Sequence, residues 1–460
     1  MSVATILHPA RRPRATGVLI AALVILAGSY LATAIRPAVT PRPISGTVSP
    51  AVAERPPVEP AALDVALPAT GSLAQIDHSI DAWSKNLADN PRDYLAATDL
   101  ALLYHGRGRV SYDLADHERA LAAARTALSI EPTYAPARAI EASVQFTLHD
   151  FAGALATADA LVRDDPSQLG ALATRFDAEL ELGRIDAARA DLARLAPAGG
   201  PGVRVRQARL ASVTGDARGA LDLARSARAI AAAEASEDSP FYAYAVGEYA
   251  RLAGDASTAR AAYADALAVN ARDVASLVGL ARIDAFAGRT DAALAGLRLA
   301  TTIAPQPEPM AMLGDLLATT GDQAGAMRAF DTVRFVERLG DIQATTFDRQ
   351  LLRFELDHGG ATETLLARAR DSLAARPDWT GHDTVAWALY RLGRPSEAEA
   401  EIAAARALGA DDARLRFHDG AIRLADGDEA GGRAMLRSAL DLGPALDPIE
   451  RSEVERLLAG

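Results

Sequence analysis

The stretch of sequence that decides the fold is GRTDAALAGLRLATTIAP, residues 288–305. Its first glycine is followed by Ala293, Ala300 and Pro305, at steps of five, seven and five residues. The same skeleton opens on further glycines along the chain, and successive openings are 32 to 39 residues apart. A period near 34 residues is typical of a helical solenoid. The opening residues are Gly183, Gly215, Gly254, Gly288, Gly321, Gly360, Gly393 and Gly427.

Each position of this skeleton predicts one part of a helical hairpin. Glycine is suited to end a first helix because it adopts the left-handed backbone conformation without Cβ strain. Ala293 and Ala300 lie two turns apart on one face of the second helix, where small side chains let two helices approach closely. Pro305 ends that helix because it cannot donate the helical hydrogen bond. One period therefore predicts a helix, a tight turn, a helix and a stop.

The pattern resembles the tetratricopeptide repeat (TPR), a 34-residue helical hairpin. Gly247, Gly314 and Gly420 each stand seven residues before an opening glycine, at the small first-helix position of that family. Tyr263 and Phe330 match the aromatic position of its second helix. The resemblance covers most of the chain and implies an all-α, right-handed superhelical α-solenoid of about ten TPR-like hairpins.

Departures from the regular period predict local irregularities. Residues 106–113, GRGRVSYD, predict an enlarged turn in the first full repeat, and His149 stands where an opening glycine is expected. The two 39-residue intervals place extra residues near 231–239 and 336–342, as longer loops or lengthened helices. We expect the solenoid to extend over residues 72–445 and a capping helix over residues 446–460, because the end repeats need a polar cover.

The region before the repeats predicts a membrane attachment. Residues 17–35 contain no charged side chain, and their number is close to the ~20 residues that span a bilayer as a helix. Three arginines precede them, which places residues 1–16 in the cytoplasm and the repeats on the periplasmic or extracellular side. The alternative is a signal sequence cleaved after Ala34, which would make the protein secreted. Residues 36–71 hold eight prolines and predict a disordered linker.

Composition and motifs exclude several classes of function. The net charge of −12 argues against a nucleic-acid partner, since phosphate contacts need clustered positive charge. The chain has no cysteine, so it forms no disulfide and no cysteine-ligated zinc site. The single lysine, Lys85, lacks the glycine-rich context of a phosphate loop. The eight histidines are scattered. The sequence therefore predicts no catalytic residue, metal, cofactor or small-molecule substrate.

What the sequence does offer is a surface. In TPR proteins the first helices line a concave groove, and the resemblance implies partner contacts at fixed first-helix positions. Aromatic and arginine side chains at such positions are frequent anchors, although the aromatics could instead pack against adjacent repeats. Trp387 is the strongest candidate, because Val385, Ala386 and Leu389 already fill the expected core positions. The predicted groove residues are Phe241, Tyr244, Glu248, Arg251, Arg282, Asp315, Asp383, Trp387, Tyr390 and Arg391.

These features predict a membrane-tethered scaffold or adaptor that binds a protein or peptide partner in its concave groove, outside the cytoplasm. Roles in envelope or cytochrome assembly are implied by the resemblance alone. Two alternatives stay open. The first is a self-associating structural spacer. The second is an enzyme with a site in an enlarged repeat turn such as residues 106–116, although rigid elements support catalytic groups better than turns do.

Overall fold

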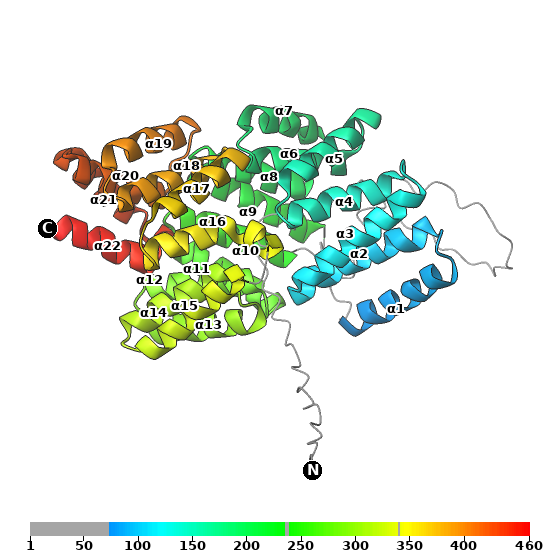
Figure 1. Ribbon diagram of the computed structural model, residues 1–460, viewed down its shortest axis with the longest axis horizontal. Helices are drawn as coiled ribbons and strands as arrows, with labels where there is room; N and C mark the ends of the chain where they lie inside the picture. Colours follow the sequence, from blue (N-terminus) through cyan, green and yellow to red (C-terminus); the bar gives the residue numbers. More distant parts are fainter. Residues whose placement is uncertain (1–72, 235–238, 339–340) are drawn as a thin grey trace, which may run out of the picture.

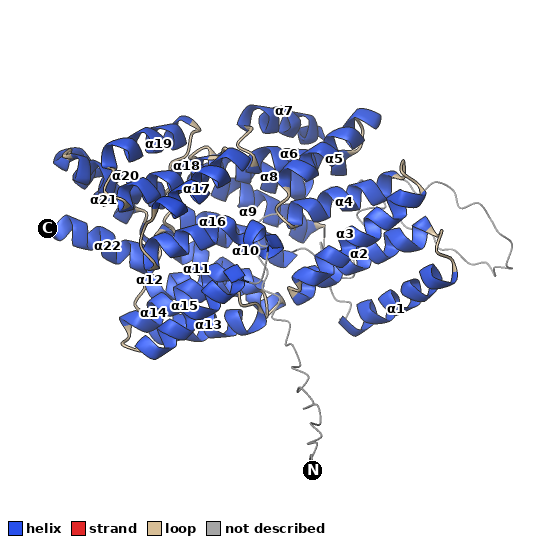
Figure 2. Cartoon of the chain, viewed as in Figure 1, coloured by secondary structure: helices blue, strands red, loops and turns tan. Residues whose placement is uncertain are grey.

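A computed structural model of the protein describes residues 73–234, 239–338 and 341–460. All regular structure in these residues is helical, in 22 α-helices and two short 3₁₀ helices, as Figure 2 shows. The predicted all-α fold is therefore confirmed for the described part of the chain. The predicted transmembrane helix, residues 17–35, and the linker, residues 36–71, lie outside it. Within it, no helix combines the length and the apolar character needed to cross a membrane.

Consecutive helices pair into ten hairpins within the described ranges, flanked by α1 (Leu73–Asp89) and α22 (Pro448–Ala459). The first helices of the hairpins are α2 (Tyr94–Ser111), α4 (Ala135–Thr147), α6 (Leu169–Glu181), α8 (Gly200–Val213), α10 (Ser239–Leu252), α12 (Val274–Phe286), α14 (Pro307–Thr319), α16 (Asp341–His358), α18 (Trp379–Arg391) and α20 (Ala413–Asp426). The second helices are α3 (Leu114–Ile130), α5 (Phe151–Asp164), α7 (Ile185–Leu195), α9 (Ala217–Ala233), α11 (Ala256–Val269), α13 (Thr290–Ile303), α15 (Gln323–Arg338), α17 (Glu363–Ala375), α19 (Pro395–Ala407) and α21 (Glu429–Asp441). The 3₁₀ helices are η2 (Ala196–Ala198) and η3 (Gly443–Ala445).

The turn inside each hairpin has the backbone conformation that the sequence predicts. All eight opening glycines have positive φ, between 70° and 97°. His149, which replaces the glycine in one copy, also has positive φ, 61°. A residue with a Cβ is strained at positive φ. The turn geometry therefore explains why the other copies have glycine at this position. In several turns the next residue is an aspartate whose carboxylate accepts the N–H three residues on, thereby capping the second helix. These caps are Asp150, Asp216, Asp255 and Asp428.

The core of the array consists of small residues packed against a few large ones. Ala293 and Ala300 are completely buried on α13, as their spacing predicts. A Cβ built at Gly247 would lie 2.6 Å from Cδ1 of Tyr263, and one built at Gly314 would lie 2.6 Å from Cδ1 of Phe330. The second-helix aromatic ring therefore lies directly on the first-helix glycine, which explains why the two positions occur together.

Two of the predicted irregularities are lengthened helices, and the predicted enlarged turn is wrong. Residues 106–111 continue α2, so that the turn consists only of Tyr112 and Asp113. Gly108 serves close packing here, because a Cβ at this position would lie 2.7 Å from Nε2 of His117. The structure therefore has no enlarged turn at residues 106–116 that could hold the alternative enzymatic site. The 39-residue intervals correspond to the long helices α9, α15 and α16.

The hairpins wind into a superhelix whose successive turns touch. Arg376, just before α18, returns to the end of α6, where its Nη2 lies 3.9 Å from Oε2 of Glu181; Figure 1 shows the orange helices α17 and α18 next to the green helices α6 and α8. The backbone N–H of Val274, at the start of α12, donates to the hydroxyl of Tyr112 at 3.1 Å. A Cβ at Gly215, after α8, would lie 2.9 Å from the carbonyl oxygen of Gly409, before α20. Such contacts fix the spacing between successive turns of the superhelix.

Candidate functional site

The predicted groove residues lie on four first helices, α10, α12, α14 and α18. Most of their side chains are engaged by the chain itself. Phe241, Arg251, Asp383 and Trp387 are buried, and Arg391 is exposed. The half-buried members are Tyr244, Glu248, Arg282, Asp315 and Tyr390. The contacts of these residues define the site.

On α10, Arg251 and Glu248 form an ion pair, with 2.5 Å between Nη2 and Oε1. The Tyr263 hydroxyl donates to Oε2 of Glu248 at 2.7 Å. Burial alone would raise the pKa of Glu248, but the adjacent guanidinium of Arg251, with help from Arg282 and the Tyr263 hydroxyl, lowers that pKa to about 2. Glu248 is therefore a carboxylate at neutral pH, and it orients Arg251.

Arg251 and Arg282 both reach a part of the chain far away in sequence. Nη1 of Arg251 donates to the carbonyl oxygens of Pro444 and Ala445, at 3.4 and 3.1 Å. Nε of Arg282 donates to Oδ1 of Asp447 at 2.9 Å, while its Nη2 donates to Glu308 at 2.7 Å. Pro444, Ala445 and Asp447 belong to what we call the C-terminal segment, residues 443–459, which comprises η3, two connecting residues and α22. Glu308 lies on α14.

The C-terminal segment is held between two groups of first helices. In Figure 1, α22 lies between α20 and α21 on one side and the helices around α12 and α14 on the other. Nε of Arg414, on α20, donates to Oε1 of Glu450 at 2.5 Å. The Arg451 guanidinium lies 5.0 Å from the ring centroid of Phe286, on α12. We call the surface of α10, α12, α14, α16 and α20 that faces this segment the inner face.

Sequence reasoning identified several inner-face residues but missed their occupant. The local signals predict a helix start, because the Asp447 carboxylate and the Glu450 side chain form a capping box at the beginning of α22. They carry no information about contacts with α10 and α12. Hydrogen bonds here join residues 165 to 194 positions apart.

On α18 the predicted anchor Trp387 is a packing residue, only 4 % exposed. Its ring stacks on His418 with 4.0 Å between centroids, and its Nε1 donates to Asp357 at 2.9 Å. Nδ1 of His418 lies 2.7 Å from Oδ1 of Asp383. Trp387 therefore packs against a neighbouring repeat, which is the alternative that the sequence leaves open for this position.

Asp315, on α14, contacts a histidine of the next hairpin. Its Oδ1 lies 2.7 Å from Nε2 of His358, whose Nδ1 lies 2.9 Å from the carbonyl oxygen of Phe354. Burial, the largest single influence, lowers the pKa of His358. The hydrogen bond and charge of Asp315, together with the Phe354 carbonyl and Asp357, raise it by more, so the net direction is upward. This pair links α14 to α16 across the inner side of the array.

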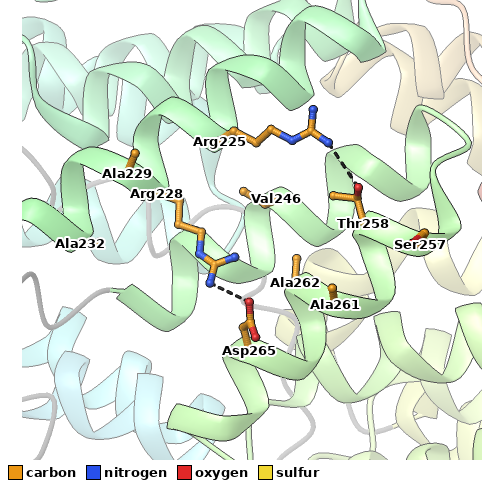
Figure 3. A pocket seen from close by; sticks show the side chains of 10 residues that line it. All are labelled: Arg225, Arg228, Ala229, Ala232, Val246, Ser257, Thr258, Ala261, Ala262 and Asp265. Atoms are coloured by element: carbon orange, nitrogen blue, oxygen red, sulfur yellow. Dashed lines mark hydrogen bonds and ion pairs between the residues drawn. The ribbon is translucent and has the colours of Figure 1, made fainter.

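A depression of about 510 Å³ opens over α9, α10 and α11 (Figure 3). Its two arginines are engaged by the chain itself. Arg228 pairs with Asp265 at 2.8 Å, and Arg225 donates to the Thr258 hydroxyl at 3.3 Å. The remaining lining is mostly alanine, so the depression offers little for specific recognition. No group of three or more acidic or histidine side chains suited to a metal ion occurs in residues 73–234, 239–338 and 341–460.

A second polar cluster lies inside the first hairpin, where His105 and His117 are both buried. Their Nδ1 atoms are 3.1 Å apart. Burial, the neighbouring imidazole and Arg109 lower the pKa of His105. Burial also lowers the pKa of His117, to about 3, despite the nearby Asp116 carboxylate. Both rings are therefore neutral in the folded protein at pH 7.

This pair makes the first hairpin sensitive to acid. Below the unfolded-state pKa of about 6.5, the unfolded chain binds protons that the folded chain excludes, so stability falls as pH decreases from about 6.5 towards 3. Each histidine contributes up to about 1.4 kcal/mol per pH unit. We expect circular-dichroism melts between pH 7 and 5 to show a smaller loss for H105N/H117N than for the wild type. Replacing His78, an exposed histidine of α1 that is not part of this pair, by Asn serves as the control; an equal effect of both changes would contradict the assignment.

The fold and the contacts place the described chain in the class of TPR-like helical-hairpin arrays. No family model and no curated protein matches the chain. Two solved structures are similar to parts of it. A tetratricopeptide repeat protein from Parabacteroides merdae is 17 % identical over 56 % of this chain and 99 % of its own, with a TM-score of 0.31. PilW, described as a widely conserved type IV pilus biogenesis factor, is 14 % identical over 47 % of this chain and 99 % of its own, with a TM-score of 0.38. At these values neither structure assigns an activity or a partner to this chain.

Proposed function

We propose that this chain is an interaction scaffold whose first helices bind a protein or peptide partner outside the cytoplasm, tethered by residues 17–35. The observation that carries the proposal is the chemistry of the inner face. There, Arg251 binds two consecutive backbone carbonyls and Arg282 binds a carboxylate, both on a segment that is not part of a repeat. Main-chain and carboxylate contacts from arginine are the means by which a protein surface recognises a peptide. No catalytic role is proposed.

Arg391 gives an accessible position from which to test the proposal. It is exposed at the end of α18, and its guanidinium lies 5.9 Å from the ring centroid of Trp387. Met327, on the second helix α15, is 64 % exposed and provides a matched position outside the predicted groove. A photo-crosslinking amino acid at either site leaves the buried contacts of the hairpins in place.

We expect the full-length chain with p-benzoylphenylalanine at position 391, irradiated in intact cells, to give a discrete adduct that the same probe at position 327 does not give. Protease added to spheroplasts should then digest the adduct, since the repeats are proposed to face outward. Equal adducts at both positions would contradict a specific groove partner. Protection of the repeats from the protease would contradict the proposed orientation.

A further inference from the structure

The inner face has the charge and donor pattern of a site for an acidic segment. In the described ion pairs, four arginines surround the C-terminal segment: Arg251, Arg282, Arg353 and Arg414. The carboxylates paired with them are Glu248 and Glu308 from the repeats, and Asp447 and Glu450 from the segment. Asp412, at the start of α20, is a further carboxylate of the repeats near Arg414. Without the segment, these four arginines would therefore face three carboxylates.

Asp447 is the centre of this arrangement. Its Oδ1 accepts from Arg282 at 2.9 Å, and its Oδ2 lies 3.6 Å from Nη2 of Arg414. Burial would raise the pKa of the Asp447 carboxyl, but the surrounding arginines together hold it well below its ordinary value. In the described ion pairs, Arg414 has partners only in the segment, Asp447 and Glu450. An occupant without carboxylates would leave this half-buried arginine with no ion-pair partner and only the Asp412 carboxylate nearby, which is unfavourable.

Leu446 and Val454 of the segment are buried in the apolar core, and Arg451 lies over Phe286. The contacts that Arg251 makes do not depend on the side chains of the segment. Arg251 binds the carbonyl oxygens of Pro444 and Ala445, groups that any extended chain presents. The segment follows the hairpin of α20 and α21 and is not itself part of a repeat. Its helix, α22, has 12 residues, which is about the length at which an isolated helix is only marginally stable.

We propose that the inner face is a binding site for an acidic peptide segment of a partner protein, and that the C-terminal segment occupies it as an intramolecular competitor. This rests on the proposed scaffold function and adds the chemistry of the partner and a means of regulation. A partner would supply one carboxylate between Arg282 and Arg414 and two carbonyls to Arg251. Because the segment and the partner compete for one site, the apparent affinity for the partner is proportional to the fraction of molecules in which the segment has left the inner face.

The test uses the full chain and a fluorescent peptide of residues 443–459, with fluorescence anisotropy as the measurement. D447A removes the carboxylate of the internal segment and should bind the peptide about tenfold more tightly than the wild type. E455A changes an exposed residue of the same helix and should behave as the wild type. A peptide with Asn and Gln at positions 447 and 450 should bind at least tenfold more weakly to D447A than the unmodified peptide. Adding R282A to D447A should abolish the gain.

Equal peptide affinity for D447A and the wild type would overturn the inference and leave the segment as a structural brace. E450Q, which keeps the capping carboxylate of Asp447, serves as the milder variant if D447A melts too early. Peptide binding that depends on dimerisation of the chain, detected by light scattering, would also overturn it in favour of exchange between copies. A crosslinked adduct at position 391 without peptide binding would contradict this inference but not the proposed scaffold function. Peptide binding without an adduct would contradict the proposed partner in the cell but not this inference.

Discussion

Replacing Arg206 by Ala is expected to destabilise the array more than any other single change considered. Arg206 is completely buried on α8, and its Nη2 donates to Oδ2 of Asp177, on α6, at 2.7 Å. Its Nη1 also donates to the carbonyl oxygen of Gly202 at 3.3 Å. Removing the guanidinium leaves the buried Asp177 carboxylate with only the more distant Arg209, 3.9 Å away, and losing the closer partner of a buried ion pair costs about 3–5 kcal/mol. Hydrogen exchange of the α6 to α8 amides would measure this loss locally, because repeats of a solenoid can open separately.

Two controls separate the loss of the charge pair from a general packing defect. In R206M/D177L both charges are replaced by apolar groups, and most of the stability should return. Burial already raises the pKa of Asp177 although Arg206 and Arg209 act to lower it. Without Arg206 this pKa rises further, so the folded variant takes up a proton and the loss should be smaller at pH 5 than at pH 7. A loss that is independent of pH and persists in the double variant would contradict the charge argument.

The repeated part of the fold could be predicted from the sequence because each hairpin is set by local chemistry. The opening glycines mark positions of positive φ. Gly314 and Phe330 together mark a close contact between the two helices of one hairpin. The enlarged turn at residues 106–113 was mispredicted because two glycines and a serine resemble turn chemistry. Gly108 is instead required where His117 packs against the helix. A glycine pattern alone does not distinguish these two uses. The handedness of the superhelix stays a prediction.

Only part of the candidate site could be predicted from the sequence. The positions of Arg251, Arg282 and Arg391 on first helices follow from the repeat register. The occupant of the inner face depends on how far the superhelix turns over five or six hairpins, and small differences in packing add up over that distance. Sequence spacing therefore placed the arginines but not Asp447, which binds Arg282 from 165 residues further along the chain. Trp387 was misjudged for a more local reason: the ring of His418, on the first helix of the next hairpin, α20, covers it.

Replacing Gly314 by Leu is the second change expected to have a large effect. A Cβ at this position would lie 2.6 Å from Cδ1 of Phe330, closer than real Cβ atoms approach a ring. The ring has little room to retreat, since its centroid lies 4.6 Å from that of His358 and 5.6 Å from that of Phe354. G314A should therefore cost about 1–3 kcal/mol by overpacking, and G314L at least as much. Urea unfolding followed by circular dichroism would measure both.

The control for this change is a glycine that faces open space in a helix. Gly170, on α6, is exposed, and a Cβ built there meets nothing within 4 Å. G170A should leave stability unchanged or raise it by up to about 1 kcal/mol, because alanine loses less backbone entropy in a helix than glycine. In G314A/F330L a shorter side chain replaces the ring. This should recover much of the lost stability, because the two residues share one contact. If G314A were as harmless as G170A, the first and second helices of this hairpin could not be as close as the glycine–aromatic contact requires.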